Sequence, residues 1–261
     1  MTLLIRDDVG AVARLTLNSP DNLNALSDAM LAALSGALAD LAGDTHIRAV
    51  TLAGAGKAFC AGHDLREMTA GRQAEDGGKA YFADLFGRCT RVMTAIRDLP
   101  QPVIAMPHGI ATAAGCQLVA SCDLAVAATG TRFGVNGVNI GLFCSTPMVA
   151  LSRVIPRKAA FEMLTTGAFV GTDEARALGL INRAVAPADL DAAALELADT
   201  IAGKLGAVVR IGKQAFYRQL EMGLDDAYAY TGDVMVENML FRDTEEGISA
   251  FLDKRPPEWT Q

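Results

Sequence analysis

Two loops rich in small residues carry the groups that are best placed to do chemistry in this chain. Residues 57–65 read KAFCAGHDL, and residues 109–117 read GIATAAGCQ. Each loop follows an apolar run and precedes a stretch with helical character. Because glycine and alanine leave the backbone uncovered, N–H groups in such loops can approach a ligand oxygen closely. An oxygen that gains negative charge during a reaction needs two such donors, each worth roughly 10²–10³ in rate.

The backbone N–H groups of His63 and Ala114 are the candidate donors. Ala114 is expected to begin a helix, whose dipole would add positive potential at that point. A backbone role for His63 is favoured over a role as a side-chain acid or base. Asp64 and Glu67 are expected to cap or solvate the helix that follows the first loop. From the residues alone, the alternative that both loops are merely tight strand-to-helix turns stays open.

The patterns around these loops predict strands that alternate with helices. Strands are predicted over residues 11–17, 47–53, 103–106 and 124–128, and helices over residues 79–99 and 114–121. A further helix is predicted after Ser27, which has the right side chain for an N-cap. Strands separated by helices in this way pair in parallel through crossover connections. The fold class is therefore α/β.

The second half of the chain has a different pattern. Helices are predicted over residues 189–205, 208–222 and 224–241, and the spacing of Asp243 and Glu246 predicts a capping box for a last one. The sequence therefore predicts an α/β core over residues 1–200 and a helical region over residues 201–261.

Composition limits the classes of protein to which the chain can belong. Its 261 residues, 51% of them hydrophobic, suffice for one sizeable core. A net charge of −7 argues against nucleic acid and anionic membranes as partners. The three His and five Cys have no metal-type spacing, so no metal is expected. No apolar run reaches the ~18 residues of a membrane span, and the chain start lacks a signal pattern. A cytoplasmic protein with reduced thiols is predicted.

Several motifs along the chain resemble those of the crotonase (enoyl-CoA hydratase/isomerase) superfamily. Residues 59–68, FCAGHDLREM, resemble its F-[CS]-A-G-x-D-[LI]-x-E-M signature, and residues 24–26, NAL, resemble the turn before its first helix. Further matches lie at residues 107–125, 133–142, 164–167, 175–182 and 247–255. Among the subgroups, residues 61–64 and 139–147 are most similar to the enoyl-CoA hydratase domain-containing protein 3 group.

The resemblance implies a crotonase-like spiral of ββα turns, a helical C-terminal trimerisation region, and homotrimers or dimers of trimers. It also implies an acyl-CoA or enoyl-CoA thioester as the ligand, with coenzyme A as part of the substrate and no permanently bound cofactor. The two loops would then form the oxyanion hole of the family. Positions that the resemblance assigns to coenzyme A binding are Ala25, Ala61, His63, Asp64, Leu65, Gly115, Phe251 and Lys254.

The chain departs from the family at the two positions where hydratases carry catalytic glutamates. These positions are Gln117 and Gly137. Gln117 can hydrogen-bond a water but cannot accept its proton near neutral pH, and Gly137 offers only backbone. Asn139 and Cys144 are the polar candidates nearby, and Cys144 or Ser145 could serve as a nucleophile in thioester hydrolysis.

Three functions therefore stay open on the sequence. The first is an enoyl-CoA hydratase/isomerase-type lyase of fatty acid metabolism with weak hydratase activity. The second is a non-catalytic or regulatory acyl-CoA-binding protein, and the third, weaker one is an acyl-CoA thioester hydrolase.

Overall fold

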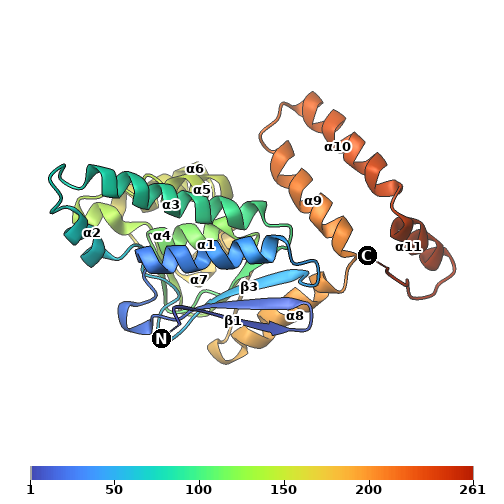
Figure 1. The fold of residues 1–261 in the computed structure, drawn as a ribbon, viewed down its shortest axis with the longest axis horizontal. Coiled ribbons are helices and arrows are strands. Elements are labelled where there is room, and N and C mark those ends of the chain that lie inside the picture. The colour runs from blue at the N-terminus through green and yellow to red at the C-terminus, as the bar shows by residue number, and fades with distance from the viewer. Residues whose placement is uncertain (1, 261) are drawn as a thin grey trace.

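The computed structural model describes residues 2–260 and is organised around a sheet of six strands (Figure 1). The strands follow the order β1-β2-β3-β4-β6-β8 across the sheet. They are β1 (Leu4–Val9), β2 (Val12–Leu17), β3 (Ala49–Gly54), β4 (Val103–Ala105), β6 (Leu124–Ala128) and β8 (Arg183–Val185). A second, two-stranded sheet pairs β5 (Ile110–Thr112) with β7 (Arg132–Gly134).

The predicted parallel pairing is confirmed from β2 onward. Strands β2, β3, β4, β6 and β8 all pair in parallel, and so do β5 and β7. Only β1 is antiparallel, because a tight turn after Val9 returns the chain directly into β2. The sequence did not predict β1. It is an edge strand whose residues are mostly exposed, so it lacks the apolar alternation of a half-buried strand.

Alternation along β2 divides the core into two layers on either side of the sheet. Ala13, Leu15 and Leu17 pack with the apolar face of α1 (Asp28–Ala42) and with α3 (Lys79–Asp98). Val12 points the other way, into a smaller cluster with α8 (Leu190–Ala202). The inner strands are therefore covered on both faces, as expected for a parallel sheet.

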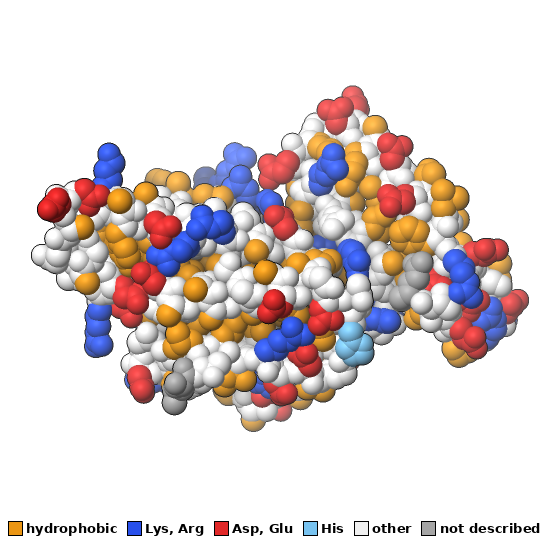
Figure 2. Space-filling model, viewed as in Figure 1, with side chains coloured by type: hydrophobic (Ala, Val, Ile, Leu, Met, Phe, Trp, Pro, Cys, Tyr) orange, Lys and Arg blue, Asp and Glu red, His pale blue; other side chains and the backbone are white. Residues whose placement is uncertain are grey.

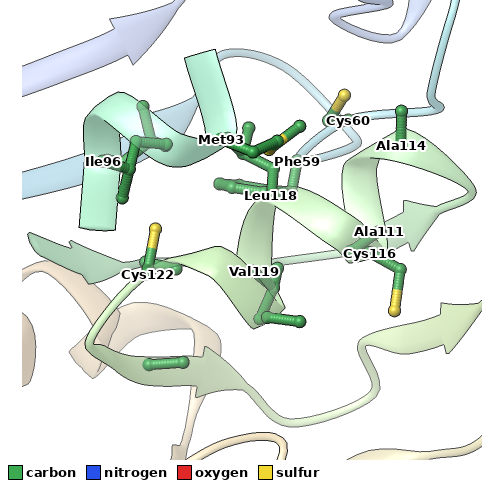
Figure 3. Close-up of a cluster of buried hydrophobic side chains, with 14 of the residues drawn as sticks. Phe59, Cys60, Met93, Ile96, Ala111, Ala114, Cys116, Leu118, Val119 and Cys122 are labelled. Atoms are coloured by element: carbon green, nitrogen blue, oxygen red, sulfur yellow. The ribbon is translucent and has the colours of Figure 1, made fainter. Parts of the chain in front are cut away.

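The helices that flank the two candidate loops begin and end close to where the sequence predicts. Ser27 caps α1, because its Oγ accepts a hydrogen bond from the Met30 N–H at 3.1 Å. Helix α4 (Ala114–Ser121) is almost entirely buried, and its side chains pack among those of α3 and the first loop (Figure 3). The shorter α2 (Leu65–Gly71) follows the first loop directly.

The remaining helices lie on the core and in a projecting arm. Around the core lie η1 (Pro20–Asn22), η2 (Asn136–Ile140), α5 (Pro147–Val154), α6 (Arg157–Thr166), α7 (Thr172–Leu178) and η3 (Pro187–Asp189). The arm consists of α9 (Gly206–Gln219), α10 (Leu224–Met239) and α11 (Arg242–Leu252), and it extends away from the core (Figure 1). Helix α10 has no buried residue, and hydrophobic side chains lie open on the arm (Figure 2).

A buried ion pair attaches the arm to the core. Lys213 on α9 donates hydrogen bonds from Nζ to Asp123 Oδ2 at 2.7 Å and to the carbonyl oxygens of Ile96 and Gln101 at 3.0 Å. The Tyr217 hydroxyl donates to Asp123 Oδ1 at 2.8 Å. Burial lowers the pKa of Lys213, and the Asp123 carboxylate opposes this decrease. The buried groups are thus all paired, which fixes where α9 leaves the core.

The predicted capping box at the start of α11 is wrong. The helix begins at Arg242, with Phe241 in the N-cap position and no side-chain cap. Asp243 is fully buried and accepts hydrogen bonds from the N–H and hydroxyl of Thr260, both at 2.8 Å. Glu246 instead pairs with Arg255 at 2.6 Å. Both carboxylates therefore hold the segment after α11 against that helix. The sequence did not predict these contacts, because the paired residues are too far apart in the chain for a local pattern.

Candidate functional site

The structure brings the two predicted loops side by side. The Thr112 N–H donates to the Cys60 carbonyl at 3.0 Å, and Cys60 forms an isolated parallel bridge with Ala111. On its other side, the first loop is joined to the turn before α1, because the Leu26 N–H donates to the Gly62 carbonyl at 2.7 Å. Backbone hydrogen bonds therefore hold both loops in one rigid unit.

Gly62 is one of the points at which the two loops come into contact. A Cβ placed on Gly62 would lie 3.0 Å from the Cβ of Ala113 and 3.3 Å from the backbone nitrogen of Ala114. Gly62 also has a φ of +92°, which a residue with a side chain rarely adopts. Glycine allows both the close approach of the loops and the positive φ. Because it has no side chain, it also leaves the space beside the Ala114 N–H uncovered.

Helix α4 begins at an unusual backbone conformation. Ala113, which precedes it, has a φ of 51° and a ψ of −119°, and its N–H donates to the Gly134 carbonyl at 2.9 Å. A non-glycine residue in such a conformation costs of order 1–3 kcal/mol, and such residues cluster at functional sites. The conformation turns the chain sharply, so that Ala114 starts the helix with its N–H beside the first loop.

The N–H groups of His63 and Ala114 have no acceptor among the residues that the structure describes. Throughout residues 2–260, neither group donates a hydrogen bond to a protein oxygen. Neighbouring N–H groups are used, since Ala61 donates to Leu23 and Gln117 donates to Ala113, both at 3.0 Å. Unused donors at the start of a buried helix suit an oxygen atom of a ligand.

The side chain of His63 turns toward α3. Its ring meets the ring of Phe86 edge-on, with centroids 5.7 Å apart and an interplanar angle of 70°. Burial lowers the pKa of His63, and the nearby Arg88 guanidinium lowers it further. The imidazole is therefore neutral near neutral pH.

Asp64 has the capping role that the sequence predicts, whereas Glu67 caps a different helix from the predicted one. Asp64 is the N-cap of α2, and its Oδ1 accepts from the N–H groups of Arg66 at 2.8 Å and Glu67 at 3.3 Å. The Glu67 carboxylate accepts from the Asp28 N–H at 2.7 Å, at the start of α1. Both acids thus support helix termini next to the loop.

Gln117 lies one helical turn after Ala114, on the same face of α4. Only 5% of the residue is exposed, and among the described residues its Oε1 has no hydrogen-bond partner. A buried amide oxygen without a partner costs stability, so it indicates a polar group of a ligand or a water nearby.

Gly137 leaves no space for a side chain. A Cβ at this position would overlap the carbonyl oxygen of Leu142 and lie 2.9 Å from Cys144 Sγ. The loop is tied down there, because the Leu142 N–H donates to the Gly137 carbonyl at 3.0 Å. Atoms of Leu142 and Cys144 therefore occupy the space that a side chain at position 137 would need.

Asn139 and Cys144 lie on the same loop but have other surroundings. Asn139 is exposed, and its amide donates to the Gly167 carbonyl at 3.3 Å, which ties the loop to the end of α6. Cys144 is 6% exposed, and burial raises the pKa of its thiol. A buried thiol with a raised pKa is a poor nucleophile at neutral pH.

The residues that the resemblance assigns to coenzyme A fall into two groups. Ala25, Ala61 and Leu65 lie on the segments joined to the first loop, and Gly115 lies in the first turn of α4. Phe251, which is 82% exposed, and Lys254 lie at the far end of the arm, well away from α2 (Figure 1). Within one chain the structure does not bring these two groups together.

One polar pair beside the loops was missed by the sequence reasoning. The Thr112 hydroxyl donates to Asn136 Oδ1 at 2.5 Å, which links β5 to η2 next to the start of α4. The position of Thr112, two residues before Ala114, could have marked it as a residue beside the candidate donor. Its partner could not be predicted, because Asn136 lies 24 residues away in the chain.

No helix between residues 2 and 260 is long and apolar enough to cross a membrane. No three of the described His, Cys, Asp and Glu side chains come together as a metal-binding group would require.

Comparison with known proteins places the chain in a family. A family model described as "Enoyl-CoA hydratase/isomerase" matches residues 7–261. Enoyl-CoA hydratase domain-containing protein 3, mitochondrial, from Xenopus laevis is 44% identical over 95% of this chain and 83% of its own length.

Two crystal structures show the same fold over almost the whole chain. That of an enoyl-CoA hydratase from Mycobacterium smegmatis is 56% identical, with a TM-score of 0.95 and 99% of each chain covered. That of human enoyl-CoA hydratase domain-containing protein 3 is 43% identical, with a TM-score of 0.94 and coverage of 99% of this chain and 100% of the other. These matches confirm the resemblance and the crotonase-like α/β fold. The chain belongs to the enoyl-CoA hydratase/isomerase family.

Proposed function

We propose that the protein is an acyl-CoA thioester enzyme that holds the thioester carbonyl oxygen between the N–H groups of His63 and Ala114. Family membership supports an enzyme of this general type. The observation that carries the proposal is the pair of N–H groups without an acceptor among the described residues, on two loops in direct contact at Gly62. Two donors aimed at one oxygen stabilise the enolate formed when the carbon next to the thioester loses a proton.

Hydration of an enoyl thioester needs more than this oxyanion hole. A water must be deprotonated near C3 and a proton delivered to C2, and each positioned acid or base contributes about 10²–10⁴-fold. Gln117 can orient a water through its amide but cannot take its proton. Gly137 offers only backbone. The site thus supports enolate stabilisation, with weak hydratase activity.

A second candidate is an acyl-CoA-binding protein without catalytic activity. One observation favours it: the carbonyl of Leu142 fills the space that a side chain at position 137 would need. The loop thus conforms to glycine, and a carboxylate cannot be accommodated there by a local change. Thioester hydrolysis through Cys144 has no such support, because burial raises the pKa of the thiol.

The protein is further proposed to form homotrimers or dimers of trimers. The arm supports this, because α10 has no buried residue and its Leu224 and Tyr228 are each 73% exposed. One protomer cannot cover so much apolar surface, and burying it against a second copy would be favourable. Phe251 and Lys254 would then contribute to the coenzyme A site of a neighbouring protomer. Light scattering that shows a monomer at micromolar concentration would contradict this.

Calorimetry tests the proposed ligand. Butyryl-CoA should bind more tightly than butyrate, because the proposed contacts are to the nucleotide and the thioester carbonyl. Equal affinities, or no binding at millimolar ligand, would overturn the assignment of the site. A panel of enoyl- and acyl-CoA thioesters, with products identified by mass, then separates the candidates: a hydroxyacyl product indicates hydration, free acid indicates hydrolysis, and unchanged ligand indicates binding alone.

A further inference from the structure

A cavity of about 900 Å³ lies between the core helices and α9. Its lining includes Gln117 and Ser121 of α4, Phe216 and Tyr217 of α9, and Glu221 just after α9. Three arginines from three different core helices also line it: Arg97, Arg153 and Arg157. The lining of the cavity therefore combines an amide with three basic groups.

Gln117 connects this cavity to the proposed carbonyl site. It follows Ala114 by three residues, or about 4.5 Å along the helix axis, on the same face of α4. Helical side chains lean toward the N-terminus of their helix, so the amide lies over the turn that contains the Ala114 N–H. Its Oε1 is buried and has no partner among residues 2–260. An acyl chain that leaves the thioester along α4 would therefore pass this amide and enter the cavity.

Positive charge in the cavity exceeds negative charge. Asp123 also lines it, but its carboxylate is already neutralised by Lys213 at 2.7 Å and bonded to the Tyr217 hydroxyl. Glu221 is the remaining carboxylate of the lining, and its Oε1 lies 3.9 Å from Arg153 Nε.

The arginines themselves are only partly used. Arg97 uses its Nε for Asp98 at 2.8 Å, and in the described part of the chain Arg157 has no ion pair. Three guanidinium groups thus line a cavity whose own carboxylates are Asp123 and Glu221, in a protein whose net charge is −7. Arg157 therefore has no carboxylate partner among the described residues, and Arg153 has only the long contact to Glu221.

We propose that this cavity receives the distal part of the acyl group and selects acyl-CoA thioesters whose chain ends in a carboxylate. The inference rests on the proposed function, because it takes the thioester carbonyl to lie at His63 and Ala114. Guanidinium groups bind carboxylates through charge-assisted, often bidentate hydrogen bonds, which an apolar chain end cannot form. A chain ending in methyl would leave the arginines to water and gain nothing from them.

Calorimetry with matched thioesters tests the selection. Glutaryl-CoA and valeryl-CoA have the same number of acyl carbons and differ only in the terminal carboxylate. One charge-assisted hydrogen bond, discounted for the partial exposure of the arginines, predicts about tenfold tighter binding of glutaryl-CoA. The preference should shrink as salt is added, because exposed charges are screened. The neutral methyl ester of glutaryl-CoA should bind like valeryl-CoA.

A triple variant with Arg97→Gln, Arg153→Gln and Arg157→Gln should reduce the ratio of the two affinities to near one. Arg91→Gln is the matched control, since Arg91 is an exposed arginine on α3 outside the cavity lining, and it should keep the ratio. Equal affinities in the wild type, or an unchanged ratio in the triple variant, would overturn the selection while leaving acyl-CoA binding intact. Failure of every thioester to bind would instead refute the proposed function, and the selection with it.

Discussion

The carbonyl oxygen of Leu142 stands where a side chain on Gly137 would begin. The same two residues are also joined by a hydrogen bond, from the Leu142 N–H to the Gly137 carbonyl at 3.0 Å. The absence of a carboxylate at position 137 is therefore built into the path of the backbone. Replacing Gly137 alone would not restore a carboxylate, because a glutamate there would require the segment from 137 to 144 to move.

Gly137→Ala should destabilise the protein, because the added methyl group must displace the Leu142 carbonyl and the Cys144 sulfur. We expect the free energy of unfolding to fall by about 1–3 kcal/mol, as overpacking typically does. Urea denaturation measures it. Gly36→Ala is the control: its Cβ would meet nothing within 4 Å in the middle of α1. The Gly36→Ala change should raise the free energy of unfolding by roughly 0.5–1 kcal/mol, because alanine favours the helix more than glycine does. A Gly137→Ala protein as stable as wild type would show that the loop yields easily.

Gln117→Glu tests whether a missing carboxylate limits hydration. The change is nearly isosteric, so we expect a folded protein that hydrates crotonyl-CoA up to about tenfold faster than wild type, below the 10²–10⁴ available to a well-placed group. A spectrophotometric assay of enoyl-CoA loss measures the rate. A folded variant that binds acyl-CoA without any gain would indicate that the site has lost hydration altogether.

The same variant should show a pH-dependent loss of stability. Burial raises the folded-state pKa of the new carboxyl above its unfolded value of about 4.3. The charge penalty is therefore absent below about pH 4 and grows as pH rises above that value. The difference in Tm between Gln117→Glu and wild type should widen from pH 4 to pH 8. A constant difference would show that the carboxylate at position 117 is well solvated.

Ala114→Pro removes one proposed oxyanion donor while keeping the helix. Proline is favoured at the first position of a helix, where its missing N–H is not needed for helical bonding. We expect turnover of any active thioester to fall by roughly 10²–10³. Ala114→Gly changes the same residue but keeps its N–H, so this control should retain most of the turnover. Circular dichroism checks that both variants fold. Full activity in a folded Ala114→Pro protein would exclude this N–H from catalysis.

Cys144 should react slowly with iodoacetamide near neutral pH. Burial raises the pKa of its thiol, so the reactive thiolate is scarcer than in a free cysteine and becomes populated only as pH rises further. We expect alkylation at pH 7.5 to be at least about tenfold slower than for the unfolded chain, as followed by mass spectrometry. Fast labelling of Cys144 in the folded protein would revive the thioester hydrolase alternative.

Lys213→Met should be strongly destabilising, because it leaves the Asp123 carboxylate buried without its cation. Breaking a buried pair in this way costs about 3–5 kcal/mol. Adding Asp123→Asn should recover part of the loss, since the uncompensated charge disappears. The exposed Lys158→Met serves as a control for loss of a lysine. Chemical denaturation of the three variants measures these changes, and a neutral Lys213→Met would show that water replaces the ammonium group.

Much of the architecture could be predicted from the sequence, because it depends on short-range patterns. The limits of α3, α4 and β6 follow from periodicity and from flanking prolines and glycines, which act over a few residues. The composition of the two small-residue loops likewise indicates an approach of backbone to ligand, and the family motifs identify the kind of fold.

Tertiary structure alone decided how those parts meet. The contact between the loops that carry His63 and Ala114 depends on hydrogen bonds between segments about fifty residues apart, and the pair of Lys213 with Asp123 spans 90 residues. Gly137 could be read as a lost side chain, but the Leu142 carbonyl that fills its place is visible only in the folded loop. The physical reason is that the sequence records each residue's own preferences, while steric exclusion and hydrogen-bond partnership arise only when distant segments pack together.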